Sequence, residues 1–579
     1  MTTFSIGETD FLLDGRPHQV ISGTLHYFRI HPEHWADRIR TAKAMGLNTI
    51  ETYVAWNAHE PVKGEWDATG WNDLGRFLDL IAAEGLHAIV RPGPYICAEW
   101  HNGGLPVWLT STPGIGIRRS EPQFVEAVSE YLRRVYEIVA PRQIDRGGNV
   151  VLVQIENEYG AYGSDKEYLR ELVRVTKDAG ITVPLTTVDQ PMPWMLEAGS
   201  LPELHLTGSF GSRSEERLAT LREHQPTGPL MCSEFWDGWF DWWGSIHHTT
   251  DPAASAHDLD VLLAAGASVN IYMVHGGTNF GTTNGANDKG RFDPIVTSYD
   301  YDAPIDESGH PTAKFHAFRK VIAKYAPVPD VAPAERPQAP AFDVLLSGEG
   351  DWMPSAQDAE PTDAPRTFEQ LGHLGAVVRY DVELPAVSGD RAVLAIAEVR
   401  DLAWIEVDGV PVGRLSRALH ERALAIPAGT RLTVVVEDQG RVNYADRLGE
   451  AKGLIGPVTL DGSPLTGWVS TPVDVTAVAG TGGAGSGDAG VGRAGFRGSF
   501  ALDAPADLFL DTAAWGKGYA FVNGFFLGRY WRATPQNTLY VPGPATRAGA
   551  NEIVVLELEQ VTAPVARFVA EPSLGQREE

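Results

Sequence analysis

Between residues 18 and 325, apolar runs of strand length alternate with amphipathic runs of helical length. A helical pattern follows most of the apolar runs, and the last one covers Thr312–Tyr325. This alternation predicts an α/β fold, and eight strand–helix units in about 300 residues predict a (β/α)8 TIM barrel. The runs expected to form its strands are His18–Leu25, Leu47–Val54, Leu86–Arg91, Asn149–Ile155, Val183–Val188, Leu204–Thr207, Leu230–Glu234 and Ser268–Val274.

Two of these runs end in carboxylates. The run through Ile155 continues as Glu156-Asn157-Glu158, and the run from Leu230 ends at Glu234. Unpaired charge is costly inside an apolar layer, so these acids should lie where the strands leave the barrel. The carboxyl ends of barrel strands are also where TIM-barrel enzymes place their active sites.

Carboxylates on two separate strand ends are what glycoside cleavage needs, because one protonates the leaving oxygen while the other attacks the sugar or activates a water. A lone glutamate at such a position is more often an exposed loop residue or half of a buried ion pair. Glu158 and Glu234 occur together, next to Asn157 and Trp236, which favours a catalytic pair. The Trp239–Trp243 cluster that follows either stacks on a sugar or belongs to the core.

Beyond the barrel, short turn-separated β runs predict all-β sandwiches, and the proline-rich segment at about 327–340 predicts a linker. The expected division is 1–328 for the barrel, 329–480 for a first β domain and 481–579 for a second sandwich. A Gly/Ala-rich linker at 480–495 is expected between the two β domains. Val407–Arg414 echoes Val522–Arg529, and the Asp-Gly and Asn-Gly pairs within them predict tight hairpins in two related sandwiches.

The formal net charge of −28 disfavours nucleic acid and anionic membrane surfaces as partners. Two cysteines, Cys97 and Cys232, give no disulfide framework, and no signal-peptide or membrane-span pattern occurs, so a cytoplasmic location is expected. No histidine has metal-ligand spacing, and the Gly480–Gly485 match to a dinucleotide fingerprint lacks a preceding βαβ unit. No metal or other cofactor is therefore expected. Self-association into a homo-oligomer stays open.

Four motifs resemble those of one enzyme family, the glycoside hydrolase family 35 β-galactosidases. They are Glu51–Pro61, Arg91–Trp100, Gln154–Gly160 and Thr297–Pro304. The similarity covers nearly the whole chain. Two departures are visible: Asn149 stands where the family usually has proline, and Trp236 stands where some relatives have tyrosine.

The resemblance implies a barrel with jelly-roll, galactose-binding-like sandwiches and a retaining mechanism without cofactor. By motif position, Glu158 would be the acid/base and Glu234 the nucleophile. The residues implied to contact the galactose are Tyr53, Ala98, Glu99, Asn157, Tyr301 and Trp236. Asn157 would hold the sugar 2-hydroxyl, a contact that strengthens in the transition state.

The expected function is therefore a retaining exo-β-galactosidase that removes terminal, non-reducing β-D-galactosyl residues by double displacement. The substrate would be a small β-galactoside or an oligosaccharide. Two alternatives stay open. One is an exo-β-glucosaminidase with the same mechanism, and the other is a non-catalytic galactoside-binding protein.

Overall fold

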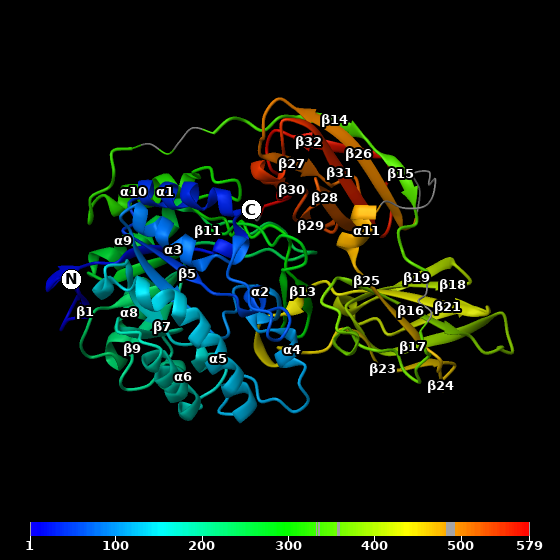
Figure 1. The fold of residues 1–579 in the computed structure, drawn as a ribbon, viewed down its shortest axis with the longest axis horizontal. Coiled ribbons are helices and arrows are strands. Elements are labelled where there is room, and N and C mark those ends of the chain that lie inside the picture. The colour runs from blue at the N-terminus through cyan, green and yellow to red at the C-terminus, as the bar shows by residue number, and fades with distance from the viewer. Residues whose placement is uncertain (1, 332, 334–335, 356–358, 482–491, 578–579) are drawn as a thin grey trace.

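The computed structural model describes residues 2–331, 333, 336–355, 359–481 and 492–577. Eight parallel strands close into a barrel in chain order, which confirms the (β/α)8 fold (Figure 1). They are β4 (Ile21–Leu25), β5 (Thr49–Tyr53), β6 (His87–Arg91), β7 (Val150–Gln154), β8 (Leu185–Asp189), β9 (His205–Ser209), β10 (Met231–Trp236) and β11 (Ser268–His275).

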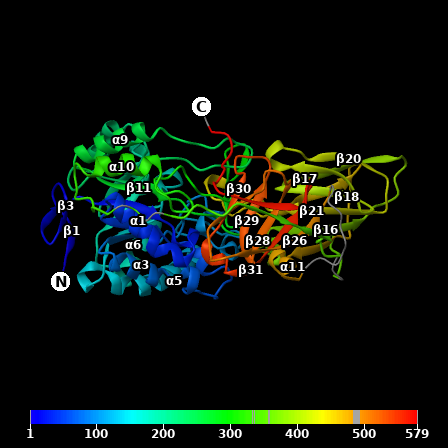
Figure 2. The same ribbon diagram turned by 90° about the horizontal axis from the view of Figure 1, so that it is seen from above.

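Helices cover the outside of the barrel (Figures 1 and 2). Those that follow the strands in order are α1 (Trp35–Met45), α3 (Leu74–Ala83), α5 (Pro122–Val139), α6 (Lys166–Asp178), α7 (Pro193–Gly199), α8 (Ser214–His224), α9 (Pro252–Ala264) and α10 (Ala313–Ile322). Two short helices, α2 (Trp56–His59) and α4 (Val107–Thr110), lie in the loops.

Local sequence explains where these helices begin. The Glu121 carboxylate accepts the backbone N–H groups of Gln123 and Phe124 at 3.1 and 2.8 Å, and Pro122 occupies the first turn of α5. Asp165 caps α6 in the same way. Each cap satisfies N–H groups that have no partner inside their own helix.

The first predicted strand was too long at its N-terminal end, because β4 begins at Ile21. The preceding residues form an antiparallel sheet of β1 (Phe4–Ile6), β2 (Phe11–Leu13) and β3 (Arg16–His18). Its rings contact His205 and His87, the first residues of β9 and β6. This small sheet therefore covers the amino-terminal end of the barrel, opposite the end that carries the predicted carboxylates.

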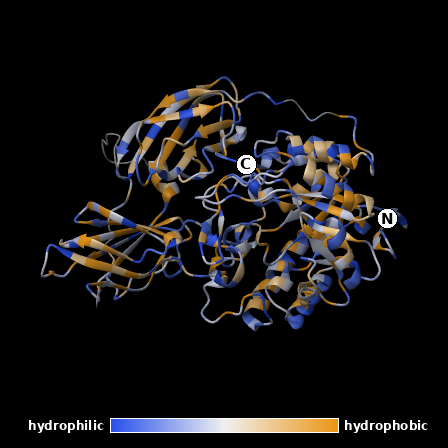
Figure 3. Ribbon diagram, turned by 180° about the vertical axis from the view of Figure 1, so that it is seen from behind, coloured by the Kyte–Doolittle hydropathy of each residue, from blue (hydrophilic) through white to orange (hydrophobic). Residues whose placement is uncertain are grey.

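The first β sandwich packs two sheets around its own apolar core. One sheet has the order β19 (Val410–Ser416), β18 (Leu402–Val407), β21 (Arg431–Glu437), β16 (Val377–Glu383) and β25 (Val469–Val473). The other has the order β20 (Ala423–Pro427), β17 (Arg391–Arg400), β23 (Gly453–Leu460) and β24 (Ser463–Pro464). Figure 3 shows apolar and hydrophilic residues alternating along such strands, as expected for sheets with one buried face.

The second sandwich is built in the same way around a separate core. One sheet has the order β15 (Ser347–Gly350), β26 (Ala494–Leu502), β31 (Gly549–Glu557), β28 (Lys517–Val522) and β29 (Phe525–Trp531). The other has the order β14 (Phe342–Leu345), β32 (Val565–Val569), β27 (Leu508–Asp511) and β30 (Thr538–Val541).

Sheet membership differs from the division expected from composition. Strands β14 and β15 fall in the segment assigned to the first β domain, but they pair with β32 and β26 of the second sandwich. Their partners lie more than 140 residues away in the chain, and composition carries no information about such pairing. Residues 482–491 of the expected Gly/Ala-rich linker lie outside the described residues, and Gly480 and Thr481 end helix α11 (Val475–Thr481).

The two sequence repeats form equivalent hairpins, β18–β19 and β28–β29. Asp408 and Gly409 turn the first with φ of 50° and 77°, and Asn523 and Gly524 turn the second with φ of 51° and 80°. Two consecutive positive φ angles define the tight turn that these residue pairs predict.

The barrel and the first sandwich share a small sheet near the barrel mouth. Strands β12 (Gly285–Asp288) and β13 (Phe292–Pro294) follow β11, and β12 pairs with β22 (Arg441–Val442) of the sandwich. The Tyr95 hydroxyl, in the loop after β6, donates to the Asn443 carbonyl at 2.7 Å. These contacts hold the loop that contains Tyr444 against the catalytic end of the barrel.

Candidate active site

A cavity of about 110 Å³ opens at the carboxyl ends of the barrel strands. Tyr53 ends β5, Glu158 follows β7 and Glu234 lies in β10, so three different strands deliver side chains to it. All the site residues expected from the sequence line this one cavity, namely Tyr53, Ala98, Glu99, Asn157, Glu158, Glu234, Trp236 and Tyr301. Residues far apart in the chain thus meet where a barrel enzyme places its chemistry.

Glu234 is surrounded by hydrogen-bond donors. Tyr53 donates its hydroxyl to Oε1 at 2.8 Å, Arg91 donates Nη2 to the same oxygen at 2.5 Å, and Trp236 donates Nε1 to Oε2 at 3.2 Å. Hydrogen bonds to a carboxylate and a nearby positive charge both favour its ionised form. Glu234 therefore has the surroundings that a nucleophile requires.

Glu158 has a different environment. Burial, followed by the negative charge of Glu234, raises the pKa of Glu158 to about 7, and the hydroxyl of Ser209 donates to Oε1 at 2.6 Å. A carboxyl group with this pKa holds a proton near neutral pH, as a general acid must. The surroundings of the two carboxyl groups thus differ in the way expected for a nucleophile, Glu234, and a general acid, Glu158.

Arg91 links several strand ends and was not singled out by sequence reasoning. Its Nη1 donates to Glu51 at 3.2 Å, and its Nη2 bonds both Glu234 and the side-chain oxygen of Asn157. Glu51 is fully buried and also accepts bonds from Thr24 and Asn270. Both Arg91 and Glu51 stand in the family-like motifs, but a single sequence does not show that they pair.

The loop after β6 supplies Glu99 in an unusual backbone conformation. Cys97, Ala98 and Glu99 have φ of 53°, 53° and 47° in succession, in the left-handed region that non-glycine residues rarely adopt. Tyr299 donates its hydroxyl to Glu99, and Arg29 donates to the Ala98 carbonyl at 2.6 Å. Burial raises the pKa of Glu99 to about 6. Strained backbone held by such contacts is typical of ligand-binding loops.

Glu156, the first acid of the Glu-Asn-Glu triplet, does not line the cavity. It forms a buried two-point ion pair with Arg118 at 3.1 and 2.8 Å and accepts the hydroxyl of Tyr168 at 2.8 Å. It also accepts the backbone N–H of Asn157 at 2.7 Å. Glu156 therefore fixes the end of β7 and, through it, the positions of Asn157 and Glu158.

Several cavity residues carried no sequence signal. Tyr272 in β11 and Gln190 after β8 come from the barrel, Asn287 and Lys289 from the β12–β13 hairpin, and Tyr444 from the first sandwich. Tyr444 lies far along the chain from every barrel motif, which is why the sequence did not indicate it. The two interpretations of the tryptophan cluster, sugar contact and core, apply to different members of it. Trp239 lines the cavity, whereas Trp243 is buried near Trp531.

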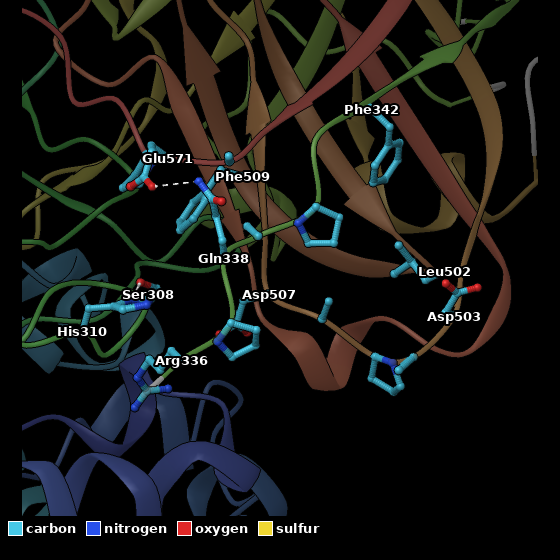
Figure 4. A pocket seen from close by; sticks show the side chains of 18 of the residues that line it. Ser308, His310, Arg336, Gln338, Phe342, Leu502, Asp503, Asp507, Phe509 and Glu571 are labelled. Carbon is cyan, nitrogen blue, oxygen red and sulfur yellow. Dashed lines mark hydrogen bonds between the residues drawn. The ribbon is translucent and has the colours of Figure 1, made fainter. Parts of the chain in front are cut away.

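A larger cavity, of about 890 Å³, shares no lining residue with the catalytic cavity and lies between the linker after α10 and the second sandwich (Figure 4). Several of its polar groups already contact protein. Gln338 donates to Glu571 at 3.4 Å, and Asp507 accepts the Tyr540 hydroxyl and a backbone N–H. None of the predicted site residues lines it. Size alone therefore does not identify the active site.

Within the described ranges, no group of three or more His, Cys, Asp or Glu side chains is arranged to hold a metal ion. In the same part of the chain, no helix is both long and apolar enough to cross a lipid bilayer.

Comparison with known proteins gives matches along the whole chain. Residues 10–325 match the model of glycosyl hydrolases family 35. Residues 365–474 match the first all-beta domain of beta-galactosidase, and residues 495–551 match its galactose-binding domain. The chain belongs to glycosyl hydrolase family 35.

Similar members of the family come from bacteria and mammals. The chain is 39% identical to the beta-galactosidase of Xanthomonas manihotis, and the match covers 94% of this chain and 92% of that one. It is also 39% identical to human beta-galactosidase, over 95% of this chain and 86% of that one. The beta-galactosidase-1-like protein of Mus musculus is 39% identical over 98% and 91% of the two chains.

The structure accounts for one departure from the family pattern. Asn149, where the resemblance implies proline, donates its side-chain amide to the carbonyls of Leu78 and Leu86, each at 3.2 Å. The substitution therefore supports the junction between α3 and β6, at the amino-terminal end of the barrel, and does not change the catalytic cavity.

Proposed function

We propose that this family 35 enzyme is a retaining exo-β-galactosidase. The observation that carries the proposal is one cavity with two carboxyl groups in opposite environments, Glu234 among three donors and Glu158 with a pKa of about 7. Membership of the family and similarity to named beta-galactosidases support galactose as the sugar.

In the first step, a carboxylate oxygen of Glu234 attacks the anomeric carbon while Glu158 gives its proton to the glycosidic oxygen. The bond to the leaving group breaks, and a galactosyl ester of Glu234 forms. In the second step, Glu158 removes a proton from a water, which attacks the same carbon and displaces Glu234. The anomeric configuration is inverted twice and hence retained, and both carboxyl groups return to their starting states.

The surrounding residues have roles that follow from their contacts. Asn157, oriented by Arg91, would hold the sugar 2-hydroxyl. Glu99 presents a carboxylate that can accept two neighbouring hydroxyl groups. Asn287 also lines this cavity, and its buried side-chain oxygen has no hydrogen-bond partner among the described residues.

Paired assays test the sugar specificity. Nitrophenyl β-galactoside should be hydrolysed with a kcat/KM at least about 100-fold above that for nitrophenyl β-glucosaminide. Dominant cleavage of the glucosaminide would replace the proposal with a glucosaminidase. Tight galactoside binding without any turnover would point instead to a non-catalytic binding protein.

A further inference from the structure

Arg29 is a buried cation that no acidic side chain pairs with among the described residues. It ends a single turn of 3₁₀ helix, Tyr27–Arg29, that follows β4, and only 1% of its surface is exposed. In contrast, Arg91 and Arg118, which are buried near the same cavity, each form an ion pair with a buried glutamate. A buried charge without a paired counter-charge is costly, so Arg29 calls for a role beyond packing.

The side-chain hydrogen bonds of Arg29 go to neutral groups. Nε donates to the side-chain oxygen of Asn279 at 2.8 Å, and Nη2 donates to the Ala98 carbonyl at 2.6 Å. Nη1 donates to Nδ1 of His26 at 2.7 Å. Burial, followed by the charge of Arg29, holds the pKa of His26 well below its usual range, so a neutral ring accepts this bond. The three bonds fix the guanidinium in one orientation, with Nη2 against the loop after β6.

The residues on both sides of Glu99 contact this guanidinium. Ala98 accepts its hydrogen bond, and the centroid of the Trp100 ring lies 5.2 Å from Cζ. Ala98 and Glu99 have left-handed backbone, and such strain persists only where surrounding contacts hold it. Arg29 supplies two of these contacts. The Glu99 carbonyl is held separately, by the backbone N–H of Gly285 at 2.8 Å, so the loop keeps an anchor without Arg29.

Arg29 also acts on the Glu99 side chain through Tyr299. The guanidinium carbon lies 3.8 Å from the centroid of the Tyr299 ring, and the hydroxyl of that ring donates to Glu99. The stacked guanidinium therefore holds the ring, and the ring holds the carboxylate. Charge acts in the same direction. Burial raises the pKa of Glu99 to about 6, and the Tyr299 hydrogen bond and the Arg29 charge oppose that rise, which favours the ionised form that accepts hydroxyl groups.

A carboxylate held in this way can distinguish galactose from glucose. The two sugars differ only in the configuration at carbon 4, where galactose carries an axial hydroxyl next to the equatorial 3-hydroxyl. Glu99 can accept both hydroxyls only if its two oxygens are correctly placed. A displacement of about 1 Å at such a contact can cost a large part of the rate.

We propose that Arg29 is a positioning residue for sugar recognition. It holds Glu99 through the Ala98 carbonyl and the Tyr299 ring, and in this way it sets the preference for galactose over glucose. The inference rests on the proposed galactosidase function. Arg29 does not itself line the catalytic cavity, so it acts on the sugar only through these neighbours.

The test measures the ratio of kcat/KM for nitrophenyl β-galactoside to kcat/KM for nitrophenyl β-glucoside. The wild-type ratio should be about 100 or more, and Arg29→Met should lower it at least about tenfold. Arg29→Lys keeps a cation near Tyr299 without the planar fork and should lower the ratio by only about threefold. Arg76→Met removes an exposed arginine that lies 5.1 Å from the Trp35 ring centroid and does not line the cavity. It is the matched control and should leave the ratio unchanged.

A double-mutant cycle separates the positioning of Glu99 from a general loosening of the fold. Glu99→Gln alone should also lower the ratio, because an amide can accept hydrogen bonds through one oxygen only. If Arg29 acts through Glu99, adding Arg29→Met to Glu99→Gln should change the ratio by less than about twofold. Because each ratio compares two substrates of one variant, a general loss of activity cancels.

An Arg29→Met ratio equal to that of the wild type, or effects of the two substitutions that multiply in full, would overturn the inference. A wild-type ratio near one would do the same. If Arg29→Met does not fold, Arg29→Lys decides, and an unchanged ratio in that variant counts against the inference. Cleavage of the galactoside with an unmoved ratio removes only the role of Arg29, whereas a wild-type enzyme that cleaves neither glycoside removes the proposed function as well.

Discussion

At the scale of single residues, Arg91 holds several side chains of the site together. It is buried and bonds two carboxylates and one amide, which come from β5, from the end of β7 and from β10 across the barrel. A planar guanidinium can hold such a set in fixed geometry, whereas an ammonium group cannot. Removing one partner of a buried ion pair also leaves the other charge uncompensated.

We therefore expect Arg91→Met to lower kcat/KM by about 1,000-fold and the free energy of unfolding by about 3–5 kcal/mol. Arg91→Lys keeps the charge and should lose less activity. Steady-state kinetics and urea unfolding measure both effects. Arg213→Met, which breaks only an exposed ion pair with Glu216, is the control and should change neither. An Arg91→Met enzyme with near-normal kcat/KM would contradict this role.

Ser209 affects the pKa of Glu158. Its hydrogen bond stabilises the charged form of Glu158 and so lowers a pKa that burial has raised to about 7. In Ser209→Ala that pKa should rise further. Glu158 must be protonated for the first step, so the alkaline limb of the kcat/KM profile should move to higher pH. A limb that stays in place or moves to lower pH would show that Glu158 is not the titrating acid.

The sequence predicted Glu158 and Glu234 because a carboxylate at the end of an apolar strand is a local signal. It did not predict the pairing of Arg91 with Glu51, which depends on β5 and β6 being neighbours. It also did not predict the structural role of Glu156, which depends on contacts with Arg118 in a loop and Tyr168 in α6. The sequence did not predict Tyr444 either, because this residue enters the cavity from another domain.

At the scale of elements, the barrel strands were predicted with small errors because they are buried on both faces and read as continuous apolar runs. The edge strands of the sandwiches were harder to predict from the sequence. Strands β14 and β15 are short and only partly buried, and their partners lie far along the chain. The hairpin turns, in contrast, were predicted from two residues each, since positive φ is a local requirement.

That requirement can be measured at Gly524. Its φ is 80° and an added Cβ would meet no atom within 4 Å, so Gly524→Ala should cost only backbone strain, about 1 kcal/mol of unfolding free energy. Gly409→Ala in the equivalent hairpin should cost the same. Gly389→Ala, without positive φ and with no neighbour closer than 3.7 Å, is the control. Equal effects at Gly524 and Gly389 would contradict the turn assignment.

At the scale of the whole molecule, the three domains meet around Arg529 of the β28–β29 hairpin. Its side chain donates to Asn284 of the barrel at 2.9 Å and to Glu437 of the first sandwich at 3.1 Å. Its backbone also bonds Thr297. A further apolar cluster joins the faces of the two sandwiches. The β domains are thus packed against the barrel, and one of them reaches the catalytic cavity.

Arg529→Met should therefore weaken the contact among the three domains as well as the second sandwich. It leaves Glu437 buried with one cation fewer, and we expect a loss of about 3–5 kcal/mol in unfolding free energy. Arg567→Met, which breaks an exposed ion pair with Asp343 in the same sandwich, should cost less than about 1 kcal/mol. Thermal and urea unfolding of the full chain measure both variants. Similar losses for the two would show that the three-domain contact contributes little.

The central claim is that Glu234 forms a covalent bond to the sugar. A 2-fluoro galactosyl donor should inactivate the enzyme with one equivalent bound, and mass spectrometry of the digested protein should locate the label on Glu234. A label on Glu158 or any other residue, or hydrolysis that releases the inverted anomer without trapping, would contradict the account.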